Sequence, residues 1–111
     1  MWFIFPQLDG LGMSPMAKKF ALRNLEEAKA YLADPILGMR LFECCRALLA
    51  ITGKSAYDIM GYPDDLKLRS SMTLFAMVPE APQEFGKVLL KYYSGEPDGR
   101  TIELIQNSKV K

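Results

Sequence analysis

The sequence predicts an all-α fold: a compact single domain of six or seven short helices, preceded by an extended apolar N-terminal segment. Three observations lead to this prediction. Helix-capping residues followed by proline or by an acid recur along the chain. β-branched residues never alternate over four or more positions, so the sequence does not support a sheet. With 111 residues, 50% of them hydrophobic, the chain can form one core, and no linker divides residues 1–111.

The first two predicted helices each begin at a capping signal. A serine–proline pair at 14–15 predicts a helix over 16–22, because proline is favoured at the first helical position. Asn24 followed by Glu27 has the pattern of a capping box and predicts a helix over 25–33.

The longest predicted helix follows a second cap-plus-proline signal. Asp34 and Pro35 begin a helix over 36–52, which Gly53 ends. Its apolar side chains recur in steps of three and four residues, as on one face of a helix. They are Ile36, Leu37, Leu41, Cys44, Leu48 and Ile51.

Two further elements lie in the middle of the chain. Ser55 caps a short helical turn that ends at Gly61. Pro63 begins a helix over 64–78, which stops at Pro79 because proline cannot continue a helix.

The last two helices are also bounded by turn residues. A helix over 83–93 ends at Gly95, and Asp98 or Gly99 precedes a final helix over 100–106.

The apolar N-terminal segment, residues 2–5, consists of side chains that normally belong to a core. Only the initiator methionine precedes it, so we expect the chain to begin partway through its own fold. We also expect this segment to leave an exposed apolar patch through which two copies form a homodimer.

The composition excludes several classes of partner. A net charge of +1 creates no global field that would attract nucleic acid. No apolar run approaches the roughly 18 residues that a membrane span needs. Residues 1–6 are too short for a signal peptide and lack its basic residues. We therefore expect a cytoplasmic protein that binds neither nucleic acid nor a membrane.

The absence of histidine limits the available chemistry. Without an imidazole, the chain cannot form a Ser-His-Asp or Cys-His nucleophile or a Cys/His zinc site. The side chains of the adjacent Cys44 and Cys45 diverge by about 100° on a helix. We expect one of them to be buried as a small hydrophobe and the other to be half-exposed, and we expect no metal site and no cofactor.

Residues 63–75 are the most informative part of the chain. Polar residues fill the first two turns of the helix predicted over 64–78, and apolar residues follow. Such a helix has a buried far end and a near end that faces water, a ligand or a cleft. Basic side chains, small hydroxyls and backbone N–H groups near a helix start suit phosphate. The candidate ligand-binding residues are Gln7, Asp64, Asp65, Lys67, Arg69, Ser70 and Ser71.

A purely structural explanation of the same residues is open. The acids at 64–65 complement the helix macrodipole, and the two bases after them would then be solvated. The hydroxyls at 70–73 can bond back to the preceding turn. Gln7 can bind the loop backbone as a structural amide instead of contacting a ligand.

Five motifs of the chain form a family pattern. They are Trp2-Phe3-Ile4-Phe5-Pro6-Gln7, Leu11-Gly12-x-Ser14, Glu27-Ala28-x-Ala30-Tyr31-Leu32, Pro35-x-Leu37-Gly38-x-Arg40-Leu41 and Asp64-Asp65-Leu66-Lys67-Leu68-Arg69-Ser70-Ser71-Met72-Thr73-Leu74-Phe75. Together they resemble the bacterial family named domain of unknown function 1810. The resemblance runs nearly end to end, and it implies an α-helical fold but no established activity.

Two further expectations come from this resemblance. Members of the family usually begin earlier, with an amphipathic helix, so the resemblance implies an N-terminally shortened chain. Members often carry a calpastatin-like label, for which these residues offer no physical basis. A fainter similarity, in fold type and in a lysine before a Met/Phe-rich helix, is to the NADAR superfamily, whose members handle ADP-ribose or NAD-related compounds.

Two functions are therefore open. The first is a binding module that holds a small anionic or nucleotide-like ligand in a cleft at the start of the helix over 64–78. The alternative is an enzyme acting on an ADP-ribose or NAD-related compound, such as a NADAR-like N-glycosidase. In that enzyme Asp64 or Asp65 would be the acid/base, and Lys67 or Arg69 would hold phosphate.

Overall fold

Six helices form the secondary structure of residues 22–109, the part of the chain that this computed structural model describes; side chains are described for residues 22–106. The helices are α2 (Leu25–Ala33), α3 (Leu37–Ala50), α4 (Ala56–Met60), α5 (Asp64–Ala76), α6 (Glu84–Tyr93) and α7 (Gly99–Lys109). Residues 22–109 contain no strand, so the predicted all-α fold is confirmed. The apolar segment 2–5 and, apart from its last residue, the helix predicted over 16–22 lie outside the described residues.

Helix α2 begins where the sequence predicts. Asn24 Oδ1 accepts a hydrogen bond from the N–H of Glu27 at 3.0 Å. The Glu27 carboxylate does not return this bond to Asn24. It accepts from the N–H of Arg23 at 2.9 Å and from Arg23 Nε at 2.8 Å, one residue before the cap. Only the asparagine half of the predicted capping box is therefore formed.

Helix α3 is shorter than predicted at its C-terminal end. Asp34 Oδ1 caps its start by accepting from the N–H groups of Ile36 and Leu37, both at 2.9 Å. The predicted helix over 36–52 ends at Ala50, and Ile51 has an extended backbone.

A lysine from α6 explains where α3 ends. Lys91 Nζ donates to the carbonyl oxygen of Leu49 at 2.6 Å and also to those of Leu48 and Ile51. Helix C-termini leave carbonyl groups without partners. Because an ammonium group from another helix satisfies several of them, the backbone can leave the helix before Gly53.

The short helix α4 and the start of α5 follow the prediction. Ser55 Oγ accepts from the N–H of Asp58 at 3.1 Å, and the Asp58 carboxylate accepts from the N–H of Ser55 at 3.0 Å, which completes a capping box. Gly61 ends α4 with a φ of 75°, a conformation that glycine adopts without strain. Helix α5 spans 64–76, two residues fewer than predicted.

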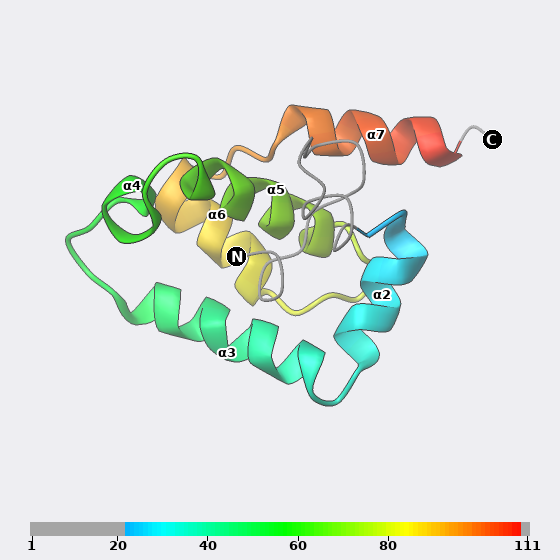
Figure 1. Ribbon diagram of the computed structural model, residues 1–111, viewed down its shortest axis with the longest axis horizontal. Helices are drawn as coiled ribbons and strands as arrows, with labels where there is room; N and C mark the ends of the chain where they lie inside the picture. The colour runs from blue at the N-terminus through cyan, green and yellow to red at the C-terminus, as the bar shows by residue number, and fades with distance from the viewer. Residues whose placement is uncertain (1–21, 110–111) are drawn as a thin grey trace.

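Helix α5 is the central element of the bundle. It packs against α2, α4, α6 and α7, while α3 packs against α2 and α6. Figure 1 shows α7 along the top and α3 along the bottom, with α5 and α6 between them. The polar residues of α5 therefore lie on a helix that packing against four other helices keeps in position.

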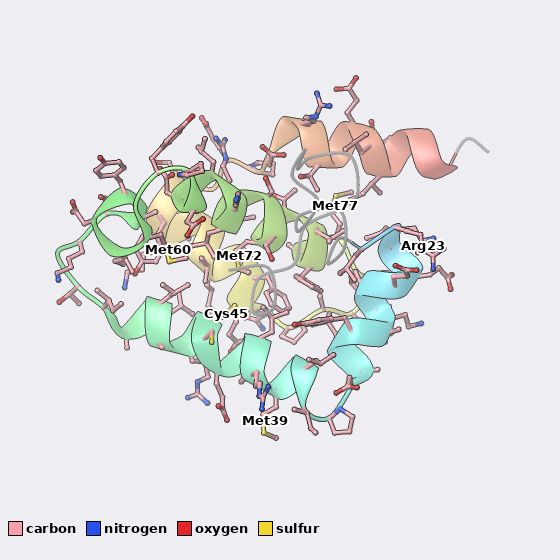
Figure 2. All side chains as sticks on the ribbon, viewed as in Figure 1. Arg23, Met39, Cys45, Met60, Met72 and Met77 are labelled. Carbon is pink, nitrogen blue, oxygen red and sulfur yellow. The ribbon has the colours of Figure 1, made fainter. Side chains whose placement is uncertain are left out.

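The core lies where α2, α3, α5 and α6 meet. The Phe75 ring of α5 lies 5.6 Å from the ring of Tyr31 and 5.5 Å from the ring of Phe85, measured between centroids. The sulfur atoms of Cys45 and Met72 are 3.6 Å apart. Figure 2 shows Cys45 on the inner side of α3, whereas Met39 points outward from the same helix.

No helix within residues 22–109 has the length and apolar character needed to cross a membrane.

Candidate functional site

The polar residues at the start of α5 do not share one face. Lys67 and Ser71 are one turn apart and lie on the same side of the helix, as does Asp64, three residues before Lys67. Arg69 lies about 160° around the helix from Lys67. The two basic residues therefore lie on different sides of α5, as helix periodicity requires.

Ser71 is the unusual residue of the first side. Its side chain is fully buried, and within the described residues its Oγ has no hydrogen-bond partner. Ser70 Oγ donates to the carbonyl oxygen of Leu66 at 3.2 Å, and Thr73 Oγ1 donates to that of Arg69 at 2.8 Å. The structural explanation, in which the hydroxyls bond back to the preceding turn, is thus correct for Ser70 and Thr73 but not for Ser71.

The same side of α5 becomes more exposed toward its N-terminal end. The Lys67 side chain retains 24% of its exposure and that of Asp64 retains 40%. Lys67 Nζ and Asp64 Oδ1 are 3.9 Å apart, which is an ion pair but longer than a charge-assisted hydrogen bond. We call the side of α5 that carries Asp64, Lys67 and Ser71 the lysine face.

Backbone groups add little to the lysine face. The N–H of Asp65 donates to the carbonyl oxygen of Gly61 at 2.9 Å, and those of Leu66 and Lys67 donate to that of Pro63 at 3.0 and 3.2 Å. The predicted phosphate contacts through N–H groups at the helix start are therefore not available from these three residues. The acids in the first turn, Asp64 and Asp65, complement the macrodipole as expected.

Arg69, on the other side of α5, holds the connection between α6 and α7. Its Nε donates to the carbonyl oxygen of Glu96 at 3.0 Å, and a terminal nitrogen donates to that of Pro97 at 3.1 Å and to the Glu96 carboxylate at 3.4 Å. The guanidinium group also lies 5.8 Å from the centroid of the Tyr93 ring. This side of α5 is engaged in a tertiary contact.

Thr73 and Asp98 extend the same contact to α7. The N–H of Asp98 donates to Thr73 Oγ1 at 2.8 Å. Asp98 Oδ2 in turn accepts from the N–H of Thr101 at 2.9 Å and from its hydroxyl at 2.7 Å, which caps α7. The Asp98–Thr101 spacing is the sequence signal for this cap, but nothing in the sequence connects Asp98 to Thr73.

Asp65 and Tyr93 meet next to this contact. The Tyr93 hydroxyl donates to the carbonyl oxygen of Asp65. Burial raises the pKa of the Tyr93 phenol, and the neighbouring Asp65 carboxylate raises it further. Asp65 Oδ1 is itself buried and, among the described residues, without a hydrogen-bond partner. Tyr93 is thus a half-buried residue at the edge of the core, as its sequence position indicates.

We expect Arg69→Ala to lower the free energy of unfolding by about 1–3 kcal/mol, because it removes hydrogen bonds from a charged donor. Arg69→Lys keeps the charge but cannot form the same fork of hydrogen bonds, and should recover only part of the loss. Urea unfolding measures both, with the exposed Lys87→Ala as the control. Equal stability of all three variants would show that this contact contributes nothing.

The two cysteines have the environments that the sequence predicts. Cys45 is buried and Cys44 is half-buried, and both are free thiols. Burial raises the pKa of the Cys45 thiol to about 12 and also raises that of Cys44, so neither favours the reactive thiolate. The described side chains contain no group of three or more histidine, cysteine, aspartate or glutamate residues that could hold a metal ion.

Gln7 lies outside the described residues, so its role as a ligand-binding residue stays a prediction.

Comparison with known proteins identifies a family and a solved relative. Residues 1–105 match the model of a family described as protein of unknown function (DUF1810). The fold is similar to that in a crystal structure of a conserved hypothetical protein from Mycobacterium tuberculosis, with a TM-score of 0.92 and 51% sequence identity; the match covers 95% of this chain and 75% of that one. No curated protein matches this chain.

Proposed function

The chain belongs to the family described as protein of unknown function (DUF1810), and we propose that it is a binding module for a small anionic ligand. The ligand is a phosphate-bearing compound of the nucleotide or sugar-phosphate kind. It binds at the lysine face of α5, with Lys67 as the cation and Ser71 as a hydrogen-bond donor.

The observation that carries this proposal is the buried hydroxyl of Ser71. A buried polar group without a partner costs about 1–3 kcal/mol, and most such groups in proteins are satisfied. Its neighbours Ser70 and Thr73 show that back-bonding is available in this helix, yet Ser71 does not use it. A ligand oxygen that accepts from Ser71 Oγ would recover this cost.

Lys67 supports the same proposal. Lys67 lies one helical turn before Ser71 on the same side of α5, and its side chain is partly exposed whereas that of Ser71 is buried. The positive end of the helix macrodipole adds to its attraction for an anion. Arg69 is not part of the proposed site, because its guanidinium group is bound to the 96–97 segment on the other side of the helix.

We expect the wild-type protein to bind at least one of ADP-ribose, ADP, AMP, ribose 5-phosphate and pyrophosphate with a Kd below 1 mM, about −4 kcal/mol. Lys67→Met and Ser71→Ala should each weaken that binding by about 1.5–3 kcal/mol, the range for a hydrogen bond to a charged group. Calorimetry measures the affinity, and Lys87→Met is the control that removes a lysine elsewhere.

Stability measurements on the same variants complete the test. Ser71→Ala should keep or slightly raise the free energy of unfolding, because it removes a buried hydroxyl that lacks a partner. The proposal is wrong if no ligand binds below 1 mM while Lys67→Met or Ser71→Ala unfolds the protein, since both residues would then be structural.

A second candidate function is an enzyme acting on an ADP-ribose or NAD-related compound. The observation in its favour is the buried and unpartnered Oδ1 atom of Asp65, because a catalytic carboxylate needs an oxygen that structural bonds leave available. The same ligand titrations, followed by proton NMR for release of a free base or sugar, separate the two functions. Turnover that Asp65→Asn abolishes without loss of binding would favour the enzyme.

A further inference from the structure

The Asp64 carboxylate lies beside the ammonium group of the lysine face. The two groups are 3.9 Å apart, and Asp64 is the more exposed of the pair, with 40% of its side chain accessible against 24% for Lys67. A separation of this length falls outside the range of a strong charge-assisted hydrogen bond, so the pair is close but loosely held. A ligand that approaches Lys67 from solvent therefore meets Asp64 at the same time.

The charges of the lysine face sum to zero. Lys67 supplies one positive charge, Asp64 one negative charge, and the Ser71 hydroxyl is neutral. Arg69 cannot add a second positive charge at this place, because it is held on the other side of α5. An anion with one charge can take the place of the Asp64 carboxylate beside the Lys67 ammonium group. An anion with two charges keeps one uncompensated charge close to a carboxylate, which repels it.

We infer that Asp64 determines the charge class of the ligand: the site selects singly charged phosphodiester groups, such as those inside a dinucleotide, over doubly charged phosphate monoesters. This inference rests on the proposed function, since it concerns the same site. Asp64 is then a specificity-determining residue, because its carboxylate repels doubly charged phosphate monoesters.

The test uses two probes that differ in charge and little else. At pH 8, dimethyl phosphate carries one negative charge and methyl phosphate carries nearly two, because the second pKa of a phosphate monoester is about 6. NMR titration of the wild-type protein and of Asp64→Asn gives the Kd of each probe. In Asp64→Asn the preference should shift by about tenfold toward methyl phosphate, the effect expected when one nearby like charge is removed.

Three further variants control the measurement. Asp64→Glu keeps the charge and should keep the wild-type preference. Asp64→Ser is a second uncharged variant that suits a helix start, and should shift the preference as Asp64→Asn does. Glu26→Gln removes an acid from the first turn of α2 instead and should leave the ratio of the two Kd values within about twofold of wild type.

The outcomes separate this inference from the proposed function. If neither probe binds the wild-type protein at millimolar concentration while one of the five nucleotide, sugar-phosphate or pyrophosphate ligands does, the proposed function stands and this inference is wrong. If none of the seven compounds binds, both are wrong. If both probes bind through Lys67 and Ser71 but the two uncharged variants keep the wild-type ratio, the binding function stands and the role of Asp64 is wrong.

Discussion

Replacing Gly38 by alanine is expected to lower the free energy of unfolding by about 3 kcal/mol or more. Gly38 is buried near the start of α3, where α3 packs against α2. A Cβ atom at this position would lie 2.2 Å from the carbonyl oxygen of Leu32. Because that oxygen belongs to a helix backbone, it cannot rotate away as a flexible side chain can. The two helices must move apart, and the core between them loses contact.

Gly86→Ala is the matched control for this substitution. Gly86 lies on an exposed position of α6, where an added Cβ meets no atom within 4 Å. Alanine is the better helix former by about 1 kcal/mol, so this variant should be at least as stable as wild type. Urea unfolding followed by circular dichroism measures both. A Gly38→Ala protein of wild-type stability would show that the α2–α3 crossing is not tightly packed.

Phe75→Ala should lower the free energy of unfolding by about 3–5 kcal/mol, the range for a buried phenylalanine. Phe75 is fully buried, and its ring contacts Tyr31 of α2 and Phe85 of α6. Removing the ring leaves a cavity where three helices meet, and rigid helices cannot collapse fully into it. A loss of this size is a large part of the 5–15 kcal/mol that holds a typical domain folded.

Leu66→Ala tests whether the effect depends on burial. Leu66 is on the same helix as Phe75 but keeps 48% of its surface exposed. Its replacement should change stability by no more than about 0.5–1 kcal/mol. If the two substitutions cost the same, the core does not centre on Phe75.

Helix starts could be predicted from the sequence because the signals are local. Asn24, Asp34 and Ser55 each accept a hydrogen bond from a backbone N–H two or three residues further along the chain. The bond depends on residues that are adjacent in sequence, so the pattern alone is enough. The end of α3 was not predicted correctly, because Lys91 reaches it from another helix.

The polar character of the candidate site could be predicted from the sequence, but the contacts of its side chains could not. The sequence indicated that the start of α5 is polar and its far end buried. It did not reveal that the partners of Arg69 lie 27 and 28 residues further along the chain. Nor did it reveal that Ser70 Oγ bonds to the preceding turn, whereas Ser71 Oγ has no hydrogen-bond partner among the described residues.

By itself, therefore, the sequence determined the all-α class, the positions at which helices begin and the family resemblance, because these depend on spacing within a few residues. The tertiary structure alone decided that Gly38 must lack a side chain, that Arg69 holds the α6–α7 connection and that the Ser71 hydroxyl is buried without a hydrogen-bond partner among the described residues. Those roles depend on which distant segments pack together, and packing is set by the complementarity of whole helix surfaces, not by any short pattern.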